Sequence, residues 1–263
     1  MTPETIGFLD SGIGGLPYLE HLRHRLGGCR FVYVADRENF PYGEKDRDKI
    51  IDATLSVAAR LIARENPLLI VVACNTMSVI ALDALRARFP LPFVGVVPAV
   101  KPAAELSRRR CVGVLATRQT VEGEYLRTLI ERHATGCAVV SLSSGSLVEF
   151  VEKAMYGASE EERRERVRQE VSRFRTAGID ALVLGCTHFL HLEQEFRLLL
   201  EAEGIALVDS RDGVSRQVMR LLPSDTGSRN GAEDVMHLTG QAPLEARYPW
   251  FAGRFALRLA GVL

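Results

Sequence analysis

The sequence has no excess of charge of either sign, because Lys and Arg together number 33 and so do Asp and Glu. A protein that binds nucleic acid needs a basic excess or at least a basic stripe. The nearest approach to a stripe is the run of three arginines at 108–110, and such a short run before an apolar segment is typical of a solvated helix end. We therefore expect no nucleic-acid partner.

Long hydrophobic runs are also missing, since no apolar stretch approaches the roughly 18–20 residues that span a bilayer. The opening MTPETIGFLD lacks the basic start and apolar middle of a signal peptide. Cysteines are few and odd in number, at 29, 74, 111, 137 and 186, and none forms a CxxC pair. This pattern argues against a disulfide framework or a zinc cage. We expect a cytoplasmic protein with free thiols, no metal and no membrane association.

What is present is an ordinary globular composition of 263 residues, with 47% apolar and 25% charged side chains. Short runs rich in Val, Ile and Leu, without alternation, are typical of strands covered on both faces. We expect strands at 6–9, 31–35, 68–73, 93–97, 111–115, 138–142, 181–184 and 205–208. The segments 45–64 and 159–175 have helical patterns, and the second begins with a capping box of Ser159 and Glu162 and closes near Gly178. Alternating strands and helices predict an α/β protein with mainly parallel sheets.

The same plan occurs twice along the chain. IGFLDSGIGG is followed by LLIVVACNT and FVGVVPAV, and later VGVLATRQTVEG is followed by ALVLGCTHF and IALVDS. In each half one strand ends in Asp-Ser or Thr, a second ends in a cysteine, and a third follows. This repeat predicts two pseudo-symmetric lobes that face each other across a cleft.

The cysteines that close the second strand of each half, Cys74 and Cys186, are the candidate reactive groups. Ligands of open parallel sheets bind beyond the carboxyl ends of the strands, where both cysteines are expected. The N–H groups that follow each cysteine would begin a helix, which favours a thiolate and offers donors to a carboxylate. Two thiols on opposite sides of one carbon suit racemisation, in which one removes a proton and the other delivers one. Without an electron sink, such a site must stabilise developing charge with fixed donors and exclude water.

The other cysteines, at 29, 111 and 137, are interpreted as packing residues. His188, two residues after Cys186, is expected to tune that thiol or share its proton. The histidines at 21, 24, 133, 191 and 237 are interpreted as surface or packing residues.

Five motifs in order resemble the bacterial glutamate racemases: DSGIGG (10–15), PYG (41–43), ACNT (73–76), LATRQTV (115–121) and GCTHF (185–189). The resemblance extends over VDS at 208–210 and HLTG at 237–240, and so covers nearly the whole chain. The members of that family are isomerases that interconvert L- and D-glutamate without a cofactor. They supply D-glutamate for peptidoglycan, and hence for cell-wall biogenesis and cell shape. The resemblance implies two lobes, 1–97 plus 208–263 and 98–207, with the active site between them.

The resemblance also implies roles for individual residues. Cys74 would act on D-glutamate with help from Asp10, and Cys186 on L-glutamate with help from His188. A glutamate that supports the second cysteine matches Glu152, with Glu149 as a competitor. The groups that would hold or surround the substrate are Ser11, Pro41, Tyr42, Gly43, Asn75, Thr76, Thr117, Thr120 and Thr187. The sequence departs from the family at Pro17, Gln119 and Glu149, which flank motifs without replacing a named polar group.

Other interpretations stay open. An aspartate or hydantoin racemase would use the same two cysteines, and only the PYG and ATRQTV context favours glutamate. A cysteine hydrolase would use Cys186 and His188 and leave Cys74 unexplained, and its Cys and His usually come from distant segments. Asp10 could be only a turn or cap residue.

A non-enzymatic ligand-binding protein would tolerate loss of both thiols. A pyridoxal-phosphate enzyme would need a Schiff-base lysine, and Lys45, Lys49, Lys101 and Lys153 offer no such context. A homodimer is the default expectation for a soluble enzyme.

Overall fold

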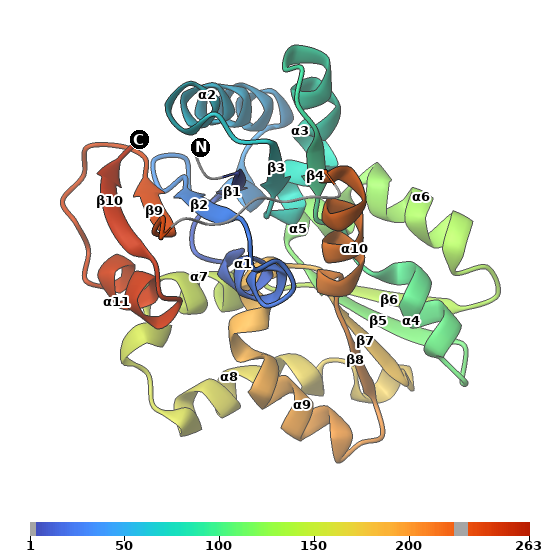
Figure 1. The fold of residues 1–263 in the computed structure, drawn as a ribbon. Helices are drawn as coiled ribbons and strands as arrows, with labels where there is room; N and C mark the ends of the chain where they lie inside the picture. The colour runs from blue at the N-terminus through green and yellow to red at the C-terminus, as the bar shows by residue number, and fades with distance from the viewer. Residues whose placement is uncertain (1–3, 224–230) are drawn as a thin grey trace. The chain divides into compact units, whose positions relative to one another are not determined.

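The computed structural model describes residues 4–223 and 231–263. The chain forms two compact units (Figure 1). Unit 1 comprises Met1–Val96 and Arg211–Leu263, and unit 2 comprises Val97–Ser210. The middle segment of the sequence therefore forms one unit, and the two ends of the chain together form the other.

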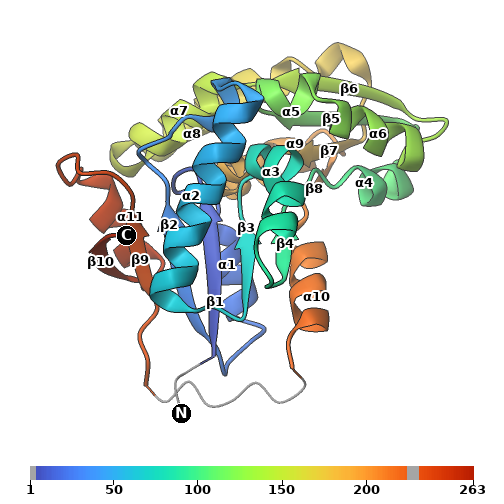
Figure 2. The same cartoon turned by 90° about the horizontal axis from the view of Figure 1, so that it is seen from above.

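Unit 1 is built on a six-stranded sheet in which all pairings are parallel. The strands, in spatial order, are β10 (Arg258–Val262), β9 (Val235–Leu238), β2 (Arg30–Ala35), β1 (Thr5–Asp10), β3 (Leu69–Val72) and β4 (Phe93–Gly95). The helices of this unit are α1 (Leu16–Arg23), η1 (Tyr42–Glu44), α2 (Arg47–Glu65), α3 (Asn75–Arg88), α10 (Arg211–Leu221) and α11 (Arg247–Arg254). Figure 2 shows α2 and α3 side by side along this sheet.

Unit 2 is built on a four-stranded parallel sheet. Its strands, in spatial order, are β6 (Ala138–Ser143), β5 (Cys111–Ala116), β7 (Ala181–Leu184) and β8 (Ala206–Val208). Its helices are α4 (Val100–Leu106), α5 (Arg118–Glu122), α6 (Glu124–His133), α7 (Gly145–Lys153), η2 (Met155–Gly157), α8 (Glu160–Ser172), η3 (Arg175–Ala177), η4 (Thr187–Leu192) and α9 (Glu193–Glu201).

The two sheets share one strand order, which is the structural counterpart of the sequence repeat. The order β2-β1-β3-β4 in unit 1 corresponds to β6-β5-β7-β8 in unit 2. The first strand of each half is central, and the strand that precedes the cysteine lies beside it. This topology confirms the predicted α/β class with two mainly parallel sheets flanked by helices.

Burial on both faces explains why the strands are apolar without alternation. Every residue of β1 is buried. On one face of the sheet in unit 1, Leu9 and Val34 belong to the core formed with α2 and α3. On the opposite face, the rings of the neighbouring residues Phe8 and Tyr33 stack with their centroids 6.4 Å apart. The middle of β1 is therefore covered on both faces and is apolar from Ile6 to Leu9.

The helix predictions hold with small shifts at their ends. Segment 45–64 forms α2, which ends at Asn66 in the left-handed conformation. Ser159 caps α8 as predicted, because its Oγ accepts a hydrogen bond from the Glu162 N–H over 3.2 Å. The helix ends earlier than predicted, and the short turn η3 fills the gap before Gly178, whose φ is +67°.

Strands β9 and β10 are absent from the sequence-based prediction. β9 has only four residues and includes His237, and β10 is a largely exposed edge strand that begins with Arg258. Neither looks like the long apolar runs of the central strands. Among the described residues, no helix is both long and apolar enough to cross a membrane.

Candidate active site

Cys74 and Cys186 occupy equivalent places in the two units. Each follows the end of its strand by two residues, since β3 ends at Val72 and β7 at Leu184. Their backbones are nearly identical, with φ and ψ of −125° and 124° at Cys74 and −134° and 132° at Cys186. Both side chains are buried. The five cysteines of the chain all lie in the described residues and are free thiols.

Cys74 begins a true α-helix. It is the N-cap of α3, and its carbonyl accepts the Ser78 N–H over 2.9 Å. Asn75 and Thr76 follow in the first turn, and both are buried. Within the described part of the chain, the buried Oδ1 of Asn75 has no hydrogen-bond partner. A buried acceptor without a donor suits a ligand that brings one, such as an ammonium group.

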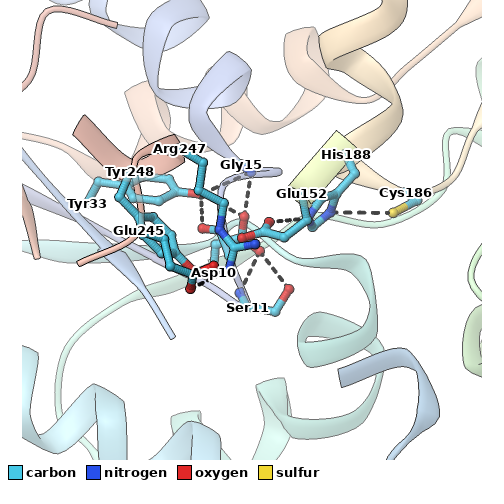
Figure 3. A network of polar contacts seen from close by, with 11 residues as sticks. Asp10, Ser11, Gly15, Tyr33, Glu152, Cys186, His188, Glu245, Arg247 and Tyr248 are labelled. Atoms are coloured by element: carbon cyan, nitrogen blue, oxygen red, sulfur yellow. Dashed lines mark hydrogen bonds and ion pairs between the residues drawn. The ribbon is translucent and has the colours of Figure 1, made fainter. Parts of the chain in front are cut away.

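Cys186 begins a different kind of turn from the one expected. The segment after it is the 3₁₀ helix η4 rather than an α-helix, and the Cys186 carbonyl accepts the Phe189 N–H over 3.2 Å. The tighter winding brings His188 back toward the sulfur. His188 Nδ1 lies 3.9 Å from Cys186 Sγ (Figure 3). Thr187, between them, is buried.

His188 links Cys186 to a carboxylate. Its Nε2 lies 2.9 Å from Oε2 of Glu152, which projects from α7 (Figure 3). Burial acts to lower the pKa of His188, but the hydrogen bonds and charges of Cys186 and Glu152 outweigh it and raise this pKa well above the ordinary value. At neutral pH the imidazole is therefore protonated, and it presents a positive charge to the sulfur and to the carboxylate.

The competition between two glutamates has a clear geometric answer. Glu152 is buried against His188, whereas Glu149, on the same helix, is exposed and pairs with Lys153 over 2.7 Å. That pairing lowers the pKa of Glu149. The structure therefore brings Glu152, and not Glu149, next to His188, whose other ring nitrogen faces Cys186.

Asp10 holds the glycine-rich loop that follows β1. Its Oδ1 accepts the Ser11 N–H over 2.7 Å, and its Oδ2 accepts the Gly15 N–H over 2.5 Å and the Tyr33 hydroxyl over 2.7 Å (Figure 3). The Tyr33 hydroxyl oxygen also lies 3.0 Å from the Gly12 carbonyl oxygen, a second acceptor for the same proton. Asp10 is completely buried. The turn-capping role considered for Asp10 is thus present in the structure.

Tyr42 is fixed by a second buried aspartate, Asp36, which the sequence reasoning did not single out. The Tyr42 hydroxyl donates to Asp36 Oδ2, and the same carboxylate accepts from the Thr239 hydroxyl and the Asn39 amide. Burial, and then the charges of Asp36 and Cys74, raise the pKa of Tyr42, which therefore stays protonated. Asp36 directly follows β2 as Asp10 closes β1, and that parallel in FVYVAD and IGFLD was the available signal.

The remaining candidates fall into two groups. Ser11, Pro41 and Gly43 lie with Asp10 and Tyr42 in unit 1, where Ser11 is buried and the other two are half-buried. In unit 2, Thr117 is the N-cap of α5, and its Oγ1 lies 3.0 Å from that of the buried Thr120. Within the described ranges, no cluster of His, Cys, Asp or Glu has the arrangement of a metal site.

Comparison with known proteins defines the class first. The family model of the Asp/Glu/Hydantoin racemases matches residues 19–214. The chain therefore belongs to the Asp/Glu/hydantoin racemase family.

Individual relatives narrow the resemblance. The chain is 41% identical to a glutamate racemase of Treponema pallidum over 97% of this chain and 95% of that protein. It is 43% identical to a glutamate racemase of Pectobacterium atrosepticum over 83% of this chain and 76% of that protein. Its structure resembles that of Escherichia coli glutamate racemase in complex with L-glutamate and the activator UDP-MurNAc-Ala, with a TM-score of 0.89, 34% identity and coverage of 99% and 98% of the two chains. It also resembles the glutamate racemase of Aquifex pyrophilus, with a TM-score of 0.73, 31% identity and coverage of 97% and 98%.

Proposed function

We propose that this chain is a glutamate racemase that interconverts L- and D-glutamate without a cofactor, with Cys74 and Cys186 as the two acid/base groups. One observation carries the proposal: two buried cysteines stand at equivalent positions, each just beyond the carboxyl end of a strand next to the central strand of its sheet. The similarity to proteins named glutamate racemase supports glutamate over aspartate or a hydantoin as the substrate.

The proposed reaction moves two protons. With D-glutamate, the Cys74 thiolate removes the α-proton, and the Cys186 thiol delivers a proton to the opposite face of the same carbon. L-glutamate leaves, with Cys74 as thiol and Cys186 as thiolate, and the reverse reaction runs from that state. A thiol whose ordinary pKa is about 8.5 can serve as acid or base near neutral pH.

The neighbours of each cysteine have distinct proposed roles. Asp10 assists Cys74, and His188, held by Glu152, assists Cys186. Protonated His188 provides a positive charge near the sulfur and the developing negative charge. Asn75 Oδ1 is an acceptor for the substrate ammonium group. The hydroxyl groups proposed to hold the amino and carboxylate groups of the substrate are those of Ser11, Thr76, Thr117, Thr120 and Thr187. Pro41, Tyr42 and Gly43 are proposed to line the site.

Two-sided proton transfer requires the units to face each other. We propose that residues 1–97 with 208–263 and residues 98–207 act as two lobes with the substrate between them. We also propose that the protein works in the cytoplasm as a homodimer and supplies D-glutamate for peptidoglycan. Sedimentation of the purified protein with and without glutamate tests the homodimer, and a single monomeric species under both conditions would contradict it.

The test of the activity uses purified protein with L-glutamate in deuterium oxide and no added cofactor. Circular dichroism follows the optical activity, and nuclear magnetic resonance follows the α-proton. The proposal predicts that ellipticity decays to zero while deuterium enters the α position. Activity with aspartate but not glutamate would overturn the substrate, and activity with neither would overturn the racemase. Full activity of Cys74→Ala would instead favour a hydrolase that uses Cys186.

A further inference from the structure

Two buried residues of unit 2, Ser144 and Glu170, and the exposed Arg173 form a cluster outside the side chains assigned to the reaction. Ser144 Oγ donates to Glu170 Oε1 over 2.5 Å, and Arg173 Nη1 donates to Glu170 Oε2 over 2.6 Å. The same Arg173 nitrogen donates to the carbonyl of Ser143 over 2.9 Å. These contacts join the residues in front of α7 to the C-terminal end of α8.

Ser144 is at the same time the N-cap of α7. Its Oγ accepts the Leu147 N–H over 3.2 Å while its proton goes to Glu170. Ser144 and Glu170 are 3% and 8% exposed, so this carboxylate relies on protein donors more than on water. The hydroxyl oxygen of Ser146 also lies 3.4 Å from that of Ser144. The hydrogen bond from the Leu147 N–H to Ser144 Oγ fixes the start of α7, and Glu170 fixes the orientation of the Ser144 hydroxyl.

The far end of α7 carries Glu152, and α7 packs against η4, which carries His188. An α-helix transmits a shift of its first turn along its length because its backbone is hydrogen-bonded throughout. Helix α7 has only nine residues, so a displaced first turn displaces Glu152 as well. The 2.9 Å contact between Glu152 and His188 leaves little room for such a displacement.

We propose that Ser144, Glu170 and Arg173 are positioning residues, which fix α7 so that Glu152 stays aligned with His188 beside Cys186. The kinetic consequence of this inference rests on the proposed racemase function, whereas the structural consequence does not. None of the three residues is assigned a contact with the substrate. Their loss therefore affects the alignment of the reacting groups and leaves ground-state binding unchanged.

The test compares Ser144→Ala with Ser159→Ala. Ser159 is a matched control because it caps α8 with the same type of hydrogen bond, of the same 3.2 Å length, to the Glu162 N–H. Both variants lose one serine cap. Ser144 caps the helix that carries Glu152 and bonds Glu170, whereas Ser159 caps α8 at the end opposite Glu170 and contacts neither residue. We expect Ser144→Ala to lower kcat for both enantiomers by roughly ten- to a hundredfold with KM unchanged. Ser159→Ala keeps the wild-type kcat, and Ser144→Thr, which retains a hydroxyl cap, restores most of it.

A second measurement does not depend on catalysis. The ring nitrogens of His188 are titrated by nuclear magnetic resonance in ¹⁵N-histidine-labelled protein, with the signal assigned from a His188→Gln sample. The midpoint should fall in Ser144→Ala, because a displaced Glu152 no longer holds the proton on His188. It should fall less in Glu170→Gln, which keeps an acceptor for Ser144 but loses the charge facing Arg173, and it should not move in Ser159→Ala.

The outcomes separate the two claims. Equal kcat and equal His188 midpoints in Ser144→Ala and Ser159→Ala would overturn the positioning role. A lower His188 midpoint in Ser144→Ala, in a wild-type protein that does not racemise glutamate, would uphold the positioning role and overturn the proposed function. If Ser144→Ala does not fold, the midpoint in Glu170→Gln decides the question, and a wild-type value there overturns the proposal.

Discussion

His188 and Glu152 form a buried pair in which Nε2 and Oε2 are 2.9 Å apart and the side chains are only 3% and 1% exposed. The pair joins a 3₁₀ turn after β7 to a helix that begins more than 40 residues earlier in the chain. A protonated histidine in such a place needs a negative partner, because burial alone disfavours the charged form. Cys186 and Glu152 together raise the pKa of His188, and Glu152 is its hydrogen-bond partner at 2.9 Å.

Glu152→Gln is expected to destabilise the folded protein by about 3 kcal/mol at neutral pH, because it leaves a buried imidazolium without its partner. It also changes the pH dependence. In the wild type, the folded state keeps a proton on His188 that the unfolded state releases above about pH 6.5. This contribution to stability is therefore full below that pH and is lost as the pH rises through the raised pKa of His188.

Urea unfolding of Glu152→Gln at a series of pH values should show a smaller decline above about pH 6.5 than the wild type shows. Glu149→Gln is the matched control, since it removes the same charge from an exposed position on the same helix. Its unfolding free energy should stay within about 0.5 kcal/mol of the wild type. A wild-type pH profile in Glu152→Gln would contradict the assignment of the proton to His188.

The pKa of His237 in β9 is shifted in the opposite direction from that of His188, so its effect on stability is expected to have the opposite pH dependence. Burial lowers its pKa, the hydrogen bond to Glu65 partly opposes that effect, and Arg64 and Arg30 add to it. At neutral pH the ring is therefore uncharged and donates its Nε2–H to Glu65 over 2.9 Å. The unfolded state binds the extra proton first, so stability is lost as the pH falls below about 6.5 toward the depressed pKa.

His237→Gln should reduce this loss on acidification, since glutamine keeps an N–H donor for Glu65 and does not titrate. Thermal unfolding between about pH 5 and 7 is the measurement, because this range spans the ordinary histidine pKa. His133→Gln, at an exposed position, serves as the control and should follow the wild type. A steeper acid loss in His237→Gln than in the wild type would show that the ring is charged in the folded protein.

Gly15 has no room for a side chain. A Cβ there would lie 2.4 Å from Cβ and 2.9 Å from the carbonyl oxygen of Ala73, the residue before Cys74. Because part of this clash is with backbone, Gly15→Ala must displace either the loop held by Asp10 or the start of α3. We expect a loss of stability of about 1–3 kcal/mol or more and a lower racemase activity.

Gly27→Ala is the control, since nothing lies within 4 Å of a Cβ at that position. Denaturant unfolding and the rate of racemisation should both match the wild type in this variant. Equal behaviour of the alanine variants at positions 15 and 27 would contradict the close approach between the glycine-rich loop and Ala73.

The sequence was sufficient to locate the cysteines at the ends of strands, because each closes an unbroken apolar run and precedes small polar residues. The sequence was also sufficient to predict the internal repeat. Asp10 and Thr117 end or follow the first strand of each half, Cys74 and Cys186 follow the second, and the two sheets have the same strand order. The contacts of Tyr33 with Asp10 and of Asp36 with Thr239 were not predictable. They depend on which strands are neighbours, and a local pattern of apolar residues carries no information about that. The choice between Glu149 and Glu152 likewise needed the direction in which α7 faces.

The central claim is that the two cysteines act on opposite faces of one carbon, and exchange of the α-proton with solvent tests it most directly. Cys186→Ala and Cys74→Ala are each incubated with D-glutamate and with L-glutamate in deuterium oxide, and deuterium at the α position is followed by nuclear magnetic resonance. Cys29→Ala, which removes a buried thiol outside the proposed site, is the control and should racemise both enantiomers.

The account predicts that neither site variant racemises glutamate, with a loss of at least about 10²–10⁴-fold. Cys186→Ala, which keeps Cys74, should exchange the proton of D-glutamate alone, and Cys74→Ala should exchange that of L-glutamate alone. Exchange of the same enantiomer by both variants, or racemisation by either at the wild-type rate, would contradict the two-thiol mechanism.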